Sequence, residues 1–127
     1  MGQLRDIETQ INEMGFQLIG ISPDRPAKVR ETSEKYKFRG PLLSDSRMTA
    51  ALAFRLAYEV DETTLQQLKN YGVDLEEASG EKHHLLPVPA VFVVASSGII
   101  QFSYVNPDYK VRLHPDLLLA SLRSARR

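Results

Sequence analysis

The sequence of 127 residues contains no cysteine and no tryptophan. The absence of cysteine excludes disulfides, thiolate metal sites and a cysteine nucleophile within these residues. It does not identify a redox compartment, because a chain without thiols is compatible with oxidising and reducing surroundings. Thiol chemistry is therefore the first functional class that this chain cannot carry out by itself.

An excess of charge of one sign and a long apolar run are absent as well. Sixteen basic residues balance sixteen acidic ones, so no net field attracts nucleic acid or an anionic membrane. No apolar run approaches the roughly 20 residues that span a bilayer, and the N-terminus lacks the basic and apolar regions of a secretory signal. We therefore expect no nucleic-acid partner, no membrane partner and, by default, a cytoplasmic location.

The composition that remains is ordinary for a globular protein, with 43% hydrophobic and 25% charged residues. The length fits a single domain over residues 1–127. Apolar periodicity and turn residues predict the order α-β-α-β-α-α-β-β-α. The expected elements are a helix through Leu4, Ile7, Ile11 and Met14, a strand Phe16–Ile21, a helix Ala27–Phe38, a strand Leu42–Leu43, a helix through Met48, Leu52 and Leu56, a helix Asp61–Tyr71, a polar loop Val73–Leu86, strands Ala90–Val94 and Ile99–Val105, and a helix from Pro115.

His83 and His84 form the one cluster that could attract a metal interpretation. Adjacent side chains point in opposite directions in an extended chain, and a zinc site needs three or four ligands, to which only Glu81 could be added nearby. A solvated loop explains the pair better. We predict no metal and no cofactor.

The residue types of a hydrolase triad are also present, as Ser22, Ser44, Asp45 and His114. No Gly-x-Ser-x-Gly elbow accompanies them, and each serine is explained by a turn or a helix cap. We assign no catalytic residue to this chain.

Four stretches in a fixed order carry a family resemblance. "LIGISPD" (Leu18–Asp24), "GPLLSD" (Gly40–Asp45), "LPVPAVFVV" (Leu86–Val94) and the following turn with Gly98 resemble peroxiredoxin-like proteins of the alkyl hydroperoxide reductase and thiol-specific antioxidant (AhpC/TSA) family. The resemblance runs from about Leu4 to the last helix. It implies an α/β, thioredoxin-like fold with a mixed central sheet flanked by helices, and an oxidoreductase family that reduces hydroperoxides through a cysteine thiolate regenerated by a thiol donor.

The main departure from this family concerns the start of the chain. In such proteins a strand ends at the peroxide-reactive cysteine and the first helix follows directly, whereas this sequence begins just after that position. We therefore expect an N-terminally truncated, redox-inactive domain. Two alternatives stay open: a shortened form of an active thiol peroxidase, and a non-enzymatic binding or assembly module that uses exposed sheet edges.

The strand without a counterpart would lie between Phe16–Ile21 and Ala90–Val94, so its absence leaves two unpaired edges. Unpaired edges are templates for further strands. We expect either that these two strands pair directly or that a second copy covers them, which would make the protein a homo-oligomer.

Two single residues also depart from the family pattern. Arg55 stands where many relatives have glycine, and Pro89 lies where many peroxiredoxins place an arginine. A proline at this point resembles the thioredoxin pattern, which implies a cis peptide bond between Val88 and Pro89. The alternative is a trans proline that starts a strand.

Overall fold

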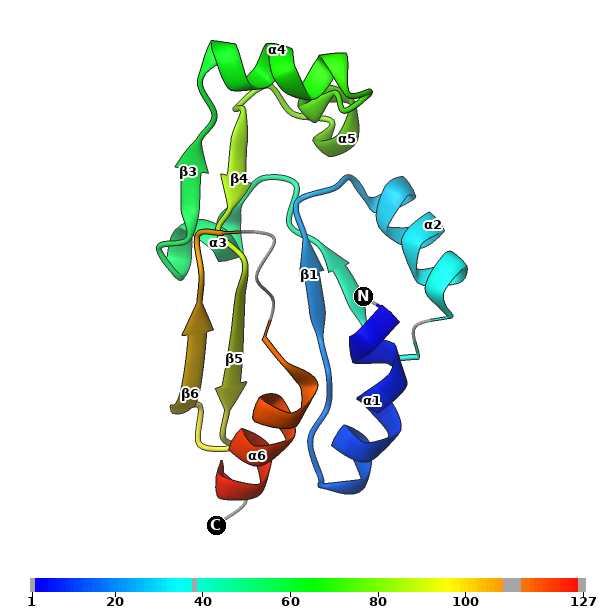
Figure 1. Ribbon diagram of the computed structural model, residues 1–127, viewed down its shortest axis with the longest axis vertical. Coiled ribbons are helices and arrows are strands. Elements are labelled where there is room, and N and C mark those ends of the chain that lie inside the picture. Colours follow the sequence, from blue (N-terminus) through cyan, green and yellow to red (C-terminus); the bar gives the residue numbers. More distant parts are fainter. Residues whose placement is uncertain (1, 38, 109–112, 126–127) are drawn as a thin grey trace.

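The computed structural model describes the backbone of residues 2–37, 39–108 and 113–125, and the side chains of these residues from Ile7 onward. Helices and strands both occur, which confirms the α/β class (Figure 1). The elements are α1 (Gly2–Glu13), β1 (Gly20–Ser22), α2 (Pro26–Tyr36), β2 (Leu42–Ser44), α3 (Thr49–Ala53), β3 (Ala57–Glu59), α4 (Glu62–Asn70), α5 (Leu75–Ser79), β4 (Leu85–Pro87), β5 (Ala90–Val94), β6 (Ile100–Val105) and α6 (Pro115–Ala125). The side chains of Leu4 and Phe38, which the sequence placed on helices, lie outside the described residues.

The described strands form three separate pairs instead of the single central sheet that we expected. β1 and β2 are parallel, with Ile21 opposite Leu43, whereas β3–β4 and β5–β6 are antiparallel. Of the two expected alternatives, direct pairing of the β1 segment with β5 does not occur, because among the described residues each of these strands pairs on one edge only. For the same reason β1 is shorter than expected and begins at Gly20, where β2 first lies opposite it.

The polypeptide from β4 to β5 changes its hydrogen-bond partner at Val88 and Pro89. The Val88 N–H donates to the Leu56 carbonyl beside β3 (2.9 Å), and the Pro89 carbonyl accepts from the Asn106 N–H beyond β6 (3.2 Å). No described peptide bond is cis, so the prediction of a cis Val88–Pro89 bond is wrong. Pro89 is a trans proline at the start of β5, where its missing N–H removes no ladder hydrogen bond.

The hydrophobic core lies where α1 and α6 pack against β5 (Figure 1). Three apolar faces meet there, and further side chains such as Phe16 and Leu18 pack against them from the segment before β1. The buried members of this core are Ile7, Ile11, Val93, Leu118, Leu119 and Leu122. The apolar periodicity of the first and last helices predicted these inward faces correctly.

The segment Val73–Leu86 is not the irregular loop that we expected, because it contains α5 and β4. Asp74 caps α5 by accepting hydrogen bonds from the N–H groups of Glu76 (3.1 Å) and Glu77 (3.3 Å), and Gly80 ends the helix in a left-handed conformation. Both are local signals of a short helix. β3, which was also not predicted, is formed by its pairing with β4 and has no strong pattern of its own.

Arg55 ends α3 in the left-handed region, at φ 59°. The N–H groups of Arg55 and Leu56 donate to the carbonyls of Leu52 (3.1 Å) and Ala51 (2.8 Å), which is the Schellman pattern of a helix end. Glycine adopts this conformation without the steric cost that a side chain carries. The geometry therefore explains why glycine suits this position, and it places backbone strain at the link between α3 and β3.

Asp61 caps α4 and makes the stability of this helix dependent on pH. Hydrogen bonds from the side chain and the backbone N–H of Thr64 lower the pKa of the Asp61 carboxyl below its ordinary value. A carboxyl with a lowered pKa contributes stability above its unfolded pKa of about 4 and loses it as the pH falls through the folded pKa. We expect the protection of the α4 amides, measured relative to their intrinsic exchange rates, to fall below about pH 4 in the wild type. Asp61→Asn keeps a capping oxygen that does not titrate, so equal acid sensitivity in this variant would contradict the assignment.

Candidate functional site

The carboxyl ends of β1 and β2 carry three of the four residues of the hydrolase pattern, namely Ser22, Ser44 and Asp45. The Ser22 hydroxyl accepts from the Asp24 N–H (3.2 Å), and the Ser44 hydroxyl donates to the Asp24 carbonyl (2.6 Å). The Asp45 carboxylate accepts from the N–H groups of Ala50 (3.0 Å) and Ala51 (2.9 Å) at the start of α3. These side chains therefore hold turns and a helix end.

The residues of the hydrolase pattern are not brought together as a triad. His114 lies at the start of α6, where its Nδ1 accepts from the Asp116 N–H (3.1 Å). Among the described residues, no serine hydroxyl is hydrogen-bonded to a histidine ring, which is the contact that activates a serine nucleophile.

His83 has a defined structural position that the solvated-loop interpretation missed. Its Nδ1 accepts from the Leu85 N–H (3.0 Å), so the proton of the neutral ring is on Nε2, which lies 2.7 Å from the Ser46 carbonyl oxygen. The half-buried ring thus joins the start of β4 to the turn between β2 and α3. The interpretation of His83 as a solvated loop residue is therefore wrong.

His84 lies beside α5. Its Nε2 is 3.6 Å from a carboxylate oxygen of Glu76, and its backbone is left-handed, at φ 54°. Within the part of the chain that the structure describes, no three His, Asp or Glu side chains gather closely enough to hold a metal ion. The histidine pair thus divides between two structural contacts.

The facing edges of β1 and β5 form the second candidate site. Figure 1 shows the β1–β2 pair beside the β5–β6 pair, with β1 and β5 running in opposite directions and their unpaired edges turned toward each other. Neither strand carries a charged residue or a proline, which are the residues that commonly block the addition of a further strand. An extended segment at this place could pair with both.

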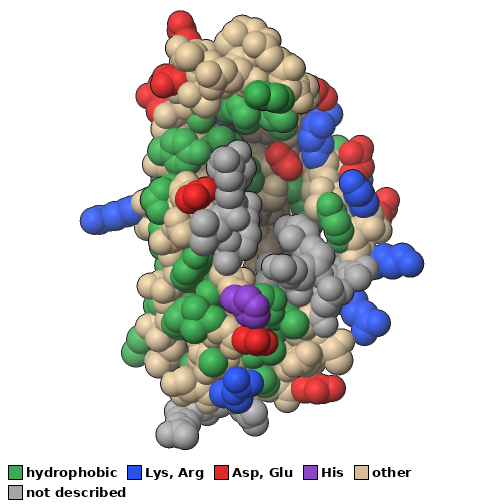
Figure 2. Space-filling model, in the orientation of Figure 1, with side chains coloured by type: hydrophobic (Ala, Val, Ile, Leu, Met, Phe, Trp, Pro, Cys, Tyr) green, Lys and Arg blue, Asp and Glu red, His purple; other side chains and the backbone are tan. Residues whose placement is uncertain are grey.

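One face of the β1–β2 pair is apolar and open. Ile19, Ile21 and Leu43 are exposed by 50%, 53% and 50%, respectively. Figure 2 also shows apolar side chains over the β3–β4 and β5–β6 pairs, whereas charged side chains gather near α2. Contiguous exposed apolar side chains are typical of surfaces that bind another chain.

Glu8 is a buried carboxylate that the sequence analysis did not single out, and only 3% of it is exposed. Its two carboxylate oxygens accept from the backbone N–H groups of Arg39 (3.1 Å) and Gly40 (2.9 Å). A Cβ atom on Gly40 would lie 2.6 Å from the Leu18 carbonyl oxygen, so the close approach requires glycine. The sequence does contain an indication that Glu8 is buried, because Glu8 follows Leu4 by four residues and therefore falls within the apolar stripe of α1.

Comparison with known proteins gives one family match. The model of the AhpC/TSA family matches residues 1–103. No curated protein matches the chain. None of the described helices is both long and apolar enough to cross a membrane.

Proposed function

The chain belongs to the AhpC/TSA family, and from this premise we propose that it is a redox-inactive, peroxiredoxin-like domain that acts as a binding or assembly module through its open sheet edges. Its fold is thioredoxin-like, as the family implies. Thiol-dependent peroxide reduction begins when a thiolate sulfur attacks the O–O bond, releasing an alcohol and leaving a sulfenic acid. The 127 residues contain no sulfur group that can take this role and be recycled by a thiol.

The observation that carries the proposal is that β1 and β5 each leave one edge without a partner strand among the described residues. Backbone N–H and C=O groups on an unpaired edge can bind a strand of another chain, and adjacent apolar side chains add to the interaction. The half-exposed Ile21 lies on β1, and Ile19 immediately precedes this strand. Because the formal net charge is zero, two copies do not repel each other through their overall charge. A second copy of the chain is therefore the proposed partner.

Sedimentation over a range of concentrations tests the assembly. We expect the wild type to form oligomers as the concentration rises, and Ile21→Lys to stay monomeric, because a charge at this position must be desolvated when the edge is covered. Tyr71→Lys is the matched control, since Tyr71 is 85% exposed and lies at the end of α4. A wild type that remains monomeric at all concentrations, or equal assembly of the two variants, would contradict the proposal.

Peroxide consumption tests the inactivity. In a mixture of hydroperoxide and dithiothreitol, we expect the rate of peroxide consumption to be the same with and without the purified chain, since the chain can form no thiolate. A rate above that of buffer would show that the redox part of the proposal is wrong. The two parts are independent, so either can fail without the other.

The same open edges support a second candidate function. A strand that carries a cysteine and is supplied from outside these residues could pair with β1 and β5 and place its thiol near the start of α1, where a helix N-terminus stabilises a thiolate. The chain would then be the scaffold of a thiol peroxidase. The intact mass of the endogenous protein and its thiol count by alkylation distinguish the two functions: a heavier species with a thiol favours the peroxidase, and a thiol-free species of the calculated mass favours the assembly module.

A further inference from the structure

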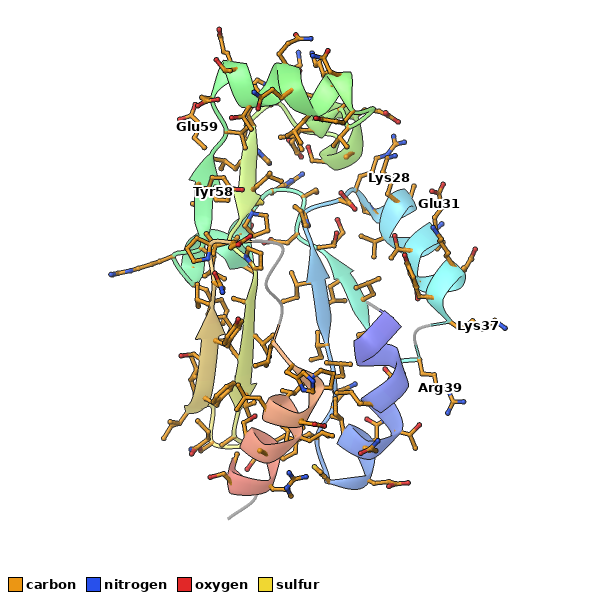
Figure 3. The ribbon with its side chains drawn as sticks, viewed as in Figure 1. Lys28, Glu31, Lys37, Arg39, Tyr58 and Glu59 are labelled. Carbon is orange, nitrogen blue, oxygen red and sulfur yellow. The ribbon has the colours of Figure 1, made fainter. Side chains whose placement is uncertain are left out.

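Lys35, Lys37 and Arg39, here called the basic patch, lie where the chain leaves α2 and approaches β2. All three side chains are exposed, and no acidic residue lies among residues 35–39. Figure 3 shows the side chains of Lys37 and Arg39 pointing away from the molecule. Among the described residues, no carboxylate forms an ion pair with any of the three. Their positive charges are therefore open to a partner from outside the molecule.

Glu59, Asp61 and Glu62, here called the acidic patch, lie where β3 meets α4. Their side chains are exposed as well, and within the part of the chain that the structure describes no basic side chain forms an ion pair with them. The nearest basic residues in the sequence are Arg55, which precedes β3, and Lys69, which belongs to the last turn of α4. The acidic patch is therefore a second group of charges without internal partners.

Helix dipoles explain part of this distribution. Asp61 and Glu62 lie at the N-terminus of α4, and Lys35 lies in the last turn of α2, so each of these charges compensates a helix dipole. The effect of a dipole falls off within the terminal turn. Arg39 lies beyond the end of α2, and Glu59 lies on β3 before the cap of α4. These two charges extend the patches beyond what the helices require.

The two patches lie on opposite sides of the molecule. In Figure 3, Glu59 marks one side, and Lys37 and Arg39 mark the other. The patches therefore cannot neutralise each other within one copy, although the chain as a whole has equal numbers of basic and acidic residues. A molecule without net charge but with separated patches of opposite sign attracts a second copy in a head-to-tail orientation.

We propose that the basic patch of one copy of this chain binds the acidic patch of a second copy, head to tail. A second copy fits because it brings three acidic residues to meet three basic ones without overall repulsion between the copies. Each copy that has used one patch still presents the other, so the contact extends into a ring or an open chain. The contact uses neither the β1 edge nor the β5 edge and is independent of the proposed function.

Sedimentation at low and high salt tests the contact. The screening length is about 30 Å at 0.01 M salt and about 3 Å at 1 M, and ion pairs between exposed side chains are individually weak. We expect the association constant of the wild type to fall about tenfold or more between these conditions, and that of Ile21→Lys to fall as well, because the substitution lies on the β1 edge. Equal association at both salt concentrations would overturn the proposal. At about 1 M salt the patches are screened, so the comparison of Ile21→Lys with the wild type there tests the strand edges alone.

Reversal of the charges gives a sharper test. Lys37→Glu with Arg39→Glu makes both patches acidic, and Glu59→Lys with Glu62→Lys makes both basic. Like charges then meet at the contact, so we expect neither double variant to associate at about 0.01 M salt. A chain with all four substitutions has no net charge and again one patch of each sign, so it should associate as the wild type does.

Lys82→Glu with Arg123→Glu is the control for net charge. It changes the net charge by the same amount as Lys37→Glu with Arg39→Glu, but at exposed positions outside both patches. We expect this control to keep most of the wild-type association at low salt. Equal losses in the control and in the variant of the basic patch would overturn the proposal, and so would a chain with all four reversals that stays monomeric.

Discussion

Replacement of Glu8 by alanine is expected to lower the free energy of unfolding by about 2–4 kcal/mol. The carboxylate of Glu8 is buried and accepts hydrogen bonds from the N–H groups of Arg39 and Gly40. Alanine would leave both partly buried donors without this acceptor, and a hydrogen bond to a charged group contributes about 1.5–3 kcal/mol. The loss would be large for a domain whose whole stability is about 5–15 kcal/mol.

Urea unfolding of three variants measures this effect. Glu8→Gln keeps one accepting oxygen and should lie between the wild type and Glu8→Ala. Glu13→Ala removes an exposed carboxylate from the same helix and should change the stability by no more than about 0.5 kcal/mol. If Glu8→Ala cost no more than Glu13→Ala, the attachment of α1 to the segment before β2 would have no energetic importance.

Replacement of Leu122 by alanine is the second change with a large expected effect, at about 2–5 kcal/mol. Leu122 is 4% exposed and belongs to the core between α1, β5 and α6. Removing its branched end leaves a cavity that rigid neighbours fill only in part, so the cost exceeds the transfer of the lost atoms from water. β5 pairs with only one described strand, β6, so no wider sheet supports this core.

Leu117→Ala on the same helix is the matched control, because Leu117 is 49% exposed. Its substitution changes helix propensity in the same way but leaves no enclosed cavity, so we expect a loss below about 1 kcal/mol. Urea midpoints with unchanged slopes would confirm that the two variants differ in stability and not in the extent of unfolding. Equal losses in the two variants would indicate that α6 is not anchored by its inward face.

Local features of the fold could be predicted well from the sequence. The apolar stripes of the first and last helices and the strands Ala90–Val94 and Ile99–Val105 depend on residues a few positions apart. Their preferences act on neighbouring backbone groups, so they hold before any tertiary contact forms. The family resemblance also predicted the fold class. The absence of cysteine excluded thiol chemistry within these residues.

Other features were decided only by the tertiary structure, because they join residues far apart in the sequence. Glu8 meets Gly40 across 32 positions, and His83 meets Ser46 across 37. Neither partner can be inferred from the residues next to Glu8 or His83. Glu8 was therefore not singled out, and His83 was interpreted as a solvated loop residue. The separation of the described strands into three pairs also depends on contacts between distant segments. Residue types and spacings alone determined the helices other than α5, the likeness to a family and the absence of a thiol, whereas packing decided which backbone groups each buried polar side chain would satisfy.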